Sequence, residues 1–265
     1  MFLFRTRENA QRKYIDLIKC ASARWPNWDP PRNFRPGDFG IVDKKTGALI
    51  VEGNIYTHPD IAQIAHQHHP IQAAEVDHYQ INSFEVRGLD VNAAAGANIP
   101  NVQSIVFNSR WQFNNKRGAI LLMHRPRMTH VPDEFFHASL HLPILKGKYV
   151  VSQVWNCPGF YMYLSSRSSE QVTVDLRANF THPAAPGINV NPSMTFSWSA
   201  EGCAGVRQYA YQSDAVYTPL FCLRSIRRPW LRRDEMGLGK EAWYEASAPW
   251  DNLNDEGETE PEDND

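Results

Sequence analysis

At 265 residues with 42% hydrophobic content, the chain is long enough to bury a full core, which excludes a fibrous or wholly disordered protein. A formal net charge of -2 conceals two parts of opposite sign, because residues 1–233 hold 26 Lys and Arg against 17 Asp and Glu, and residues 234–265 hold 12 acids and one base. A basic body of this kind is attracted to anionic surfaces such as nucleic acid or phospholipid headgroups, and an acidic tail competes for the same face.

Neither a run of 18 apolar residues nor a signal peptide is recognisable, so we expect a protein that is made and kept in the cytoplasm. The four cysteines lie far apart without C-x-x-C spacing, which predicts free thiols rather than a disulfide framework.

The N-terminal segment predicts a basic amphipathic helix over residues 8–24, because its apolar residues recur at helical spacing. Arg12, Lys13 and Lys19 lie on the other faces of this helix. A Pro- and Gly-rich stretch follows, and Lys44 and Lys45 begin a turn between short strands predicted at 39–42 and 48–51. A second helix is predicted after Pro59.

From residue 79 the hydrophobic period changes from helical to alternating. Two long strands joined by a tip are predicted over residues 79–113, and two breaks in the first strand suggest bulges or bends. The apolar positions of this pair are Tyr79, Ile81, Phe84, Val86, Ile105, Phe107, Trp111 and Phe113.

After a helix predicted over 133–142, a second set of strands begins at Tyr149. The clearest alternation of the chain runs over 171–180, and its partner is predicted at 194–199, across a Pro- and Gly-rich loop. The apolar positions of this second pair include Val172, Val174, Leu176, Phe180, Phe196 and Trp198. A last strand is predicted near 217–226, and the composition of 251–265 is typical of a disordered segment.

The search for chemistry predicts no catalytic residues, no metal and no cofactor, so the chain is not expected to be an enzyme. Phosphate-binding glycine loops and a Gly-x-Ser-x-Gly elbow are absent from the sequence. Five histidines lie between residues 58 and 78 and suggest a metal site. Because no Cys or carboxylate stands at ligand spacing from them, a polar loop is the favoured interpretation.

A cluster of basic residues without intervening acids follows the second predicted strand. It comprises Arg110, Lys116, Arg117, Arg125 and Arg127, next to a strand whose alternate residues are aromatic. Nucleic acid and an anionic membrane both suit such a surface. The strands also reach the 9 to 11 residues that a transmembrane β-strand requires, although burial in a soluble sheet is the commoner cause of alternation.

Two segments of the chain resemble fungal gasdermin-like proteins of the type that regulates cell death in allorecognition. They are FRPGDFGIVDKKTGALIVEGNIY at 34–56 and YTPLFCLRSIRRP at 217–229. The resemblance implies an α+β fold, with a gasdermin N-terminal-like pore-forming domain at 1–233 built on a twisted central antiparallel sheet. An acidic tail without a C-terminal repressor domain then occupies 234–265.

The resemblance also implies functional residues. Acidic phospholipids would contact the first helix and the adjacent hairpin through Arg5, Arg7, Arg12, Lys13, Lys19, Lys44 and Lys45. The hairpins at 79–113 and 171–199 would insert into the membrane and assemble into a large oligomer of self with a variant, allelic homologue.

Regulation is expected to differ from that of animal gasdermins, whose repressor domain is released by proteolysis. Encounter with a variant partner, as in heterokaryon incompatibility, becomes the expected trigger, and the tail is expected to act as a weak electrostatic mask. The protein would be cytoplasmic when inactive and at the plasma membrane, or another anionic membrane, when active. The alternative is a cytosolic nucleic-acid-binding or interaction module that uses its basic, aromatic-rich surface; the favoured interpretation involves no nucleic acid.

Overall fold

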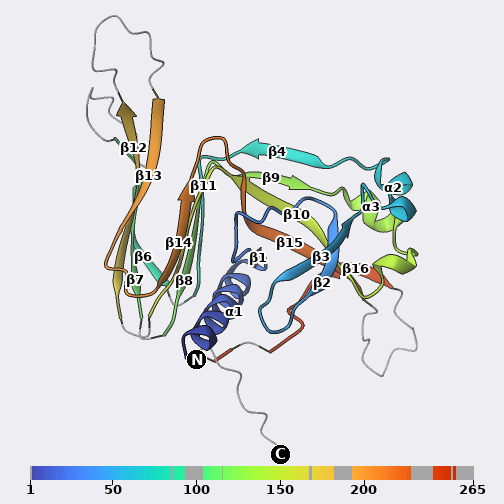
Figure 1. Cartoon of the computed structure of the whole chain (residues 1–265), viewed down its shortest axis with the longest axis horizontal. Coiled ribbons are helices and arrows are strands. Elements are labelled where there is room, and N and C mark those ends of the chain that lie inside the picture. Colours follow the sequence, from blue (N-terminus) through green and yellow to red (C-terminus); the bar gives the residue numbers. More distant parts are fainter. Residues whose placement is uncertain are drawn as a thin grey trace, which may run out of the picture.

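The computed structural model describes residues 2–84, 86–92, 104–114, 116–166, 169–181, 193–227, 241–251 and 253–254. For residues 2–9, 90–92, 104–105, 179–181 and 193–195 it describes the backbone alone. The chain is an α+β protein in which one long helix stands among three antiparallel sheets, here called sheets A, B and C (Figure 1).

The N-terminal elements are α1 (Phe2–Ser22), β1 (Trp25–Pro26), β2 (Asp38–Val42), β3 (Leu49–Asn54) and α2 (Pro59–Ala65). α1 ends where the Ser22 hydroxyl donates to the Ile18 carbonyl and Ala23 adopts a φ of 58°, a left-handed conformation that stops a helix. α2 begins with Pro at its first turn, and the His58 side chain accepts a hydrogen bond from the Asp60 amide.

Sheet A forms the half of the molecule that carries the short helices. Its strand order is β1-β15-β10-β2-β3, with β9, β4 and β16 attached at the sides. The remaining elements of this half are β4 (Ile71–Glu75), β9 (Arg127–His130), α3 (Asp133–Ala138), a 3-10 turn (Pro143–Leu145), β10 (Tyr149–Cys157), β15 (Tyr217–Arg227) and β16 (Ala242–Glu245).

The two central strands of sheet B are buried on both faces. Sheet B contains β14 (Val206–Tyr211), β11 (Gly159–Leu164), β8 (Ala119–His124) and β5 (His78–Asn82), in that order. Every residue of β8 and β11 is buried, which explains why these strands read as continuous apolar runs without alternation. One face packs against α1 and the other against sheet C.

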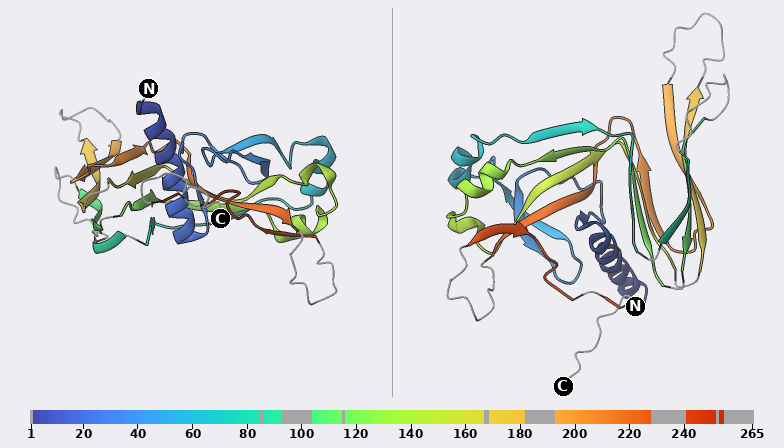
Figure 2. Two further views of the ribbon diagram at one scale, coloured as in Figure 1. Left: turned by 90° about the horizontal axis from the view of Figure 1, so that it is seen from below. Right: turned by 180° about the vertical axis from the view of Figure 1, so that it is seen from behind.

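Sheet C is the four-stranded sheet farthest from the short helices (Figures 1 and 2). Its order is β13 (Ser193–Glu201), β12 (Gln171–Thr181), β7 (Ser104–Phe113) and β6 (Val86–Asn92). The two predicted hairpins are therefore joined through β7 and β12 into one sheet.

Most predicted elements are confirmed, including the 39–42 and 48–51 hairpin, the pairing of 171–180 with 194–199, and the last strand. The prediction for 79–92 is wrong: residues 78–82 form β5 in sheet B, and only 86–92 join sheet C. The break in alternation is a crossing between sheets, because Ser83 turns the chain by exchanging hydrogen bonds with Ala119. A β-bulge between Gly88 and Asp90 explains the second break.

The predicted helix over 133–142 is shorter than expected. α3 ends at Ala138, where the Ser139 amide caps the carbonyl of Phe135, and the chain turns before the 3-10 segment at Pro143. α1, in contrast, begins earlier than predicted, at Phe2.

Candidate functional site

α1 is wedged between sheets A and B, as the views in Figure 2 show. Ala10, Tyr14 and Ile18 pack into the core beneath sheet B, and Ile15 packs into the core of sheet A. The Tyr14 hydroxyl, fully buried, donates to the Ile120 carbonyl at 3.1 Å. α1 therefore contributes to two cores at once, and its removal would expose both.

The C-terminal segment after β16, here called the strap (residues 246–251 and 253–254), returns to α1 (Figure 1). Its Ala246 amide bonds to the Leu223 carbonyl and extends the edge of sheet A. The Trp250 ring lies edge-on to Trp25, with centroids 5.5 Å apart, and its indole N–H donates to the Asp16 carboxylate at 2.8 Å. The strap thus contacts both the helix and sheet A.

Arg12 and Lys13 are covered by the strap. They are only 5% and 4% exposed. Arg12 donates to the Asp251 carbonyl at 2.9 Å and lies 3.8 Å above the Trp250 ring, and Lys13 donates to the Leu253 carbonyl at 3.0 Å. Burial lowers the pKa of Arg12, an effect that Asp16 opposes. Two of the cations predicted to contact lipid are therefore satisfied by main-chain carbonyls of the strap.

Asp16 organises this junction. Its carboxylate accepts hydrogen bonds from Trp250 and from the Leu253 amide at 3.1 Å, and it forms an ion pair with Arg12 at 3.4 Å. Sequence patterns did not identify it, because an isolated acid in a mainly basic helix carries no distinctive signal.

The β2–β3 turn meets α1 at the same junction, since Arg12 also donates to the Lys44 carbonyl. Lys44 and Lys45 are exposed at this turn. Behind them, Ile41 and Ile50 lie directly opposite each other and are 41% and 46% exposed. The turn presents cationic and apolar groups together, a combination suited to an anionic lipid interface.

The remaining predicted lipid contacts divide into two kinds. Lys19 is partly buried, with its ammonium 4.9 Å from the Trp25 ring, and burial lowers its pKa. Arg5 and Arg7 belong to α1, but their side chains lie outside the description.

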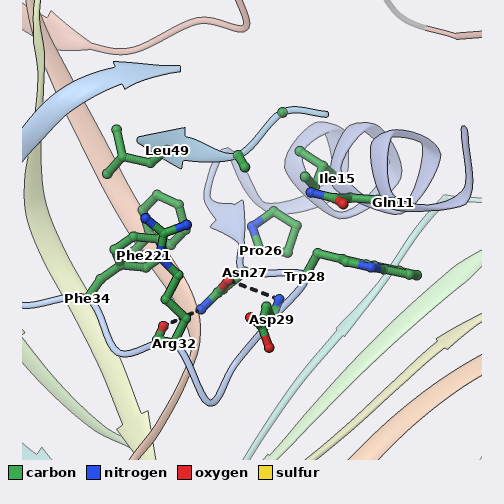
Figure 3. Close-up of a pocket in the computed structure, with 12 residues that line it drawn as sticks. Gln11, Ile15, Pro26, Asn27, Trp28, Asp29, Arg32, Phe34, Leu49 and Phe221 are labelled. Carbon is green, nitrogen blue, oxygen red and sulfur yellow. Dashed lines mark hydrogen bonds between the residues drawn. The ribbon is translucent and has the colours of Figure 1, made fainter. Parts of the chain in front are cut away.

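A cavity of about 220 Å³ lies between α1, the segment after β1 and the β2–β3 hairpin (Figure 3). Its walls include Ile15 and Trp28, and Asp29 and Arg32 line its polar side. The Asn27 amide is occupied by the Arg32 and Thr218 carbonyls, both at 2.9 Å. The lining contains no hydroxyl, thiol or imidazole. The cavity leaves this side of α1 less closely packed than the side beneath the strap.

Sheet C has one apolar and one polar face. The inward side chains pack against sheet B in one core, and Trp111, Phe113, Val172, Val174 and Leu176 are fully buried there, with Phe107 at 4% exposure. Phe196, Trp198 and Val86 are partly buried against the same core. The alternate residues form the outward face: Asn108, Arg110, Gln112, Gln171, Thr173, Asp175, Arg177, Ser197 and Ser199.

The other residues predicted for the inserting hairpins lie elsewhere or outside the description. Tyr79 and Ile81 belong to β5 in sheet B, and Phe84 is 81% exposed at the turn before β6. Ile105 and Phe180 belong to β7 and β12, but their side chains are not described.

Glu170 ties sheets B and C together at their turns. Its carboxylate, 8% exposed, accepts from the Tyr163 hydroxyl, from the Ser166 amide at 2.7 Å and from the Ala204 amide at 3.0 Å. Burial raises the pKa of Tyr163, and the hydrogen bond to Glu170 raises it further. Sequence analysis missed this residue, because a lone acid in a polar loop gives no pattern.

The predicted basic cluster is not one surface. Arg117 and Arg125 flank the two ends of the six-residue strand β8, which separates them by about 20 Å. Arg125 and Arg127 form ion pairs with Glu75, at 2.7 and 3.4 Å. The aromatic residues Phe107 and Trp111 face the core and not the surface, so they offer no stacking platform for bases.

Among the described residues, no three His, Cys, Asp or Glu side chains gather at metal-binding distances. No described helix is both long and apolar enough to cross a lipid bilayer. Comparison with models of known protein families gave no match, and comparison with curated proteins gave none either.

Proposed function

We propose that this chain is a membrane-permeabilising cell-death effector that binds acidic phospholipids, oligomerises and inserts the strands of sheet C. The observation that carries the proposal is sheet C itself, a continuous amphipathic sheet built from two hairpins. The resemblance to gasdermin-like proteins supports the same function.

Strand length supports insertion. β7, β12 and β13 contain 10, 11 and 9 residues, which match the 9 to 11 residues of a tilted transmembrane strand. Ten residues at about 3.3 Å each, tilted by about 45°, span about 23 Å, close to the apolar band of such proteins. The face that now packs on sheet B would meet lipid, and the polar face of Thr173 and Asp175 would meet water.

The edges of sheet C favour oligomerisation. Within the described strands, β6 pairs only with β7 and β13 pairs only with β12, so each edge strand keeps one unpaired side. Unpaired backbone groups are not tolerated in lipid, and a ring in which β13 of one copy pairs with β6 of the next satisfies them. A variant homologue with matching edges could enter the same ring, which supports activation by encounter with an allelic partner.

Membrane approach would begin at the β2–β3 turn, where Lys44, Lys45, Ile41 and Ile50 are accessible. Arg12 and Lys13 would follow only after the strap leaves α1, because its carbonyls occupy both side chains. In this proposal the strap therefore covers Arg12 and Lys13 by direct packing. It blocks these side chains more strongly than the electrostatic mask expected from charge alone.

Dye release from liposomes tests the function. Acidic liposomes should leak when the protein is added, alone or together with a diverged homologue, whereas zwitterionic liposomes should leak far less. Protein heated beforehand serves as the control for non-specific leakage. Absence of leakage under every pairing would reject the proposal.

A further inference from the structure

Two histidines face each other where sheet B meets sheet C. His78 begins β5 and His124 ends β8, directly opposite in the antiparallel register. Their Nδ1 atoms are 3.4 Å apart. His124 is 5% exposed, and its Nε2 has no hydrogen-bond partner within the described residues. This geometry suits two neutral rings, in which one Nδ1–H donates to the other Nδ1.

Aromatic side chains from sheet C lie on both rings. Phe107 of β7 is 5.3 Å from His78 between ring centroids, and Phe196 of β13 is 5.5 Å from His124. Tyr211 of β14 completes the cluster, 5.8 Å from His124 and 4.6 Å from Phe196. Both hairpins of sheet C therefore rest on the histidine pair.

The charged groups around the pair come from the bends that link sheets A and B. Glu75 ends β4, Asp77 lies between β4 and β5, and Arg125 lies between β8 and β9. The Glu75 carboxylate is already held by Arg125 and Arg127. Tyr211 faces His124 from β14, and β7 and β13 contribute Phe107 and Phe196, which do not titrate.

We propose that the His78–His124 pair is an acid-sensitive release for sheet C, in which protonation weakens the contact between sheets B and C. Two protonated rings would direct N–H donors at each other across 3.4 Å and would place charge beneath Phe107 and Phe196. The inference rests on the proposed function for its consequence at a membrane, but the loosening itself is measurable in solution.

The direction of the pH dependence follows from the burial of the two histidines. Burial, together with His78 and Arg125, lowers the pKa of His124 to about 4, against the opposing effect of Asp77 and Glu75. Burial also lowers the pKa of His78, against Asp77. A histidine in the released state has a pKa of about 6.5, so the released state binds more protons than the docked state. The contact is at full strength above pH 6.5 and weakens as the pH falls toward 4.

His124 alone sets the expected size of the effect. If release exposes its ring fully, the ratio of released to docked molecules rises about twentyfold between pH 7 and pH 5. His78 adds to this change in the same direction.

Hydroxyl-radical footprinting of the full chain at pH 7 and pH 5 tests the proposal. Trp111 is buried between sheets B and C, and Trp25 is buried in the core of sheet A. Oxidation of Trp111 should rise several-fold at pH 5 while Trp25 stays protected. The double variant His78→Phe/His124→Phe, which retains aromatic rings, should lose this rise. The matched variant His66→Gln/His69→Gln removes two exposed histidines and should retain it.

An unchanged Trp111 footprint in the wild type, or a rise that persists in the double phenylalanine variant, would overturn the inference. If that variant fails to fold at pH 7, His78→Phe replaces it: a shallower pH response is expected, and a response equal to wild type contradicts the proposal. Liposome leakage at both pH values separates the two proposals. A pH-dependent footprint without any leakage would reject pore formation and leave the acid-sensitive release standing.

Discussion

At the scale of single residues, a few directional contacts hold the strap on the helix and on sheet A. Trp250 contributes a ring contact with Trp25, a cation–π contact with Arg12 and a hydrogen bond to Asp16. Main-chain carbonyls of the strap accept hydrogen bonds from Arg12 and Lys13, and the charge of Asp251 adds a favourable interaction with Arg12.

The Trp250→Ala substitution should therefore release the strap. It removes an aromatic anchor and leaves Asp16 without one of its donors, which costs about 2 kcal/mol of unfolding free energy, measurable by urea titration. Limited proteolysis should cut near residue 250 sooner than in the wild type. Truncation after residue 254 is the matched control, since it removes acids but keeps the strap. Equal proteolysis of Trp250→Ala and wild type would show that the strap is not held by this residue.

At the scale of elements, the proposed function assigns membrane binding to the β2–β3 hairpin and insertion to sheet C. The hairpin carries accessible lysines beside Ile41 and Ile50, whereas the apolar face of sheet C is hidden on sheet B until it is released. Initial attachment should therefore depend on the hairpin alone.

Lys44→Gln/Lys45→Gln should weaken binding to acidic liposomes. Each lysine contributes about 1 kcal/mol near an anionic surface, so the pair should lower the apparent affinity about 30-fold at low salt. Liposome sedimentation at two salt concentrations measures this, and the difference should shrink at high salt because exposed charges are screened. Lys146→Gln/Lys148→Gln is the control, since these lysines form ion pairs with Glu241 and Glu52 away from the turn. Equal losses in both variants would contradict a specific role for the hairpin.

At the scale of the whole molecule, α1 contacts three parts to which the proposed function assigns different steps. It packs beneath sheet B, contacts the β2–β3 turn through Arg12 and carries the strap. Release of the strap would free cations for the membrane and loosen the helix that supports sheet B. The histidine pair lies on the opposite face of the same sheet, so strap and pair could control sheet C independently.

The sequence predicted the strands of sheet C well where one face is buried, since alternation follows directly from that environment, as at Val172, Val174 and Leu176. It failed at 79–82, because β5 and β6 belong to different sheets and only the short turn at Ser83 separates them. Arg12 and Lys13 carry the expected charge, but their burial arises from a strap more than 230 residues away in sequence. Long-range contacts of this kind, and the His78–His124 pair, leave no local pattern.

The central claim is that the inward face of sheet C meets lipid. Photo-crosslinking with a small diazirine amino acid tests it most directly, placed on β12 either at inward positions 172, 174 and 176 or at outward positions 173 and 175. On acidic liposomes, with the strap released by Trp250→Ala or with a diverged homologue present, inward positions should crosslink to lipid and outward positions should not. Equal crosslinking on both faces, or none at the inward positions while the liposomes leak, would contradict the account.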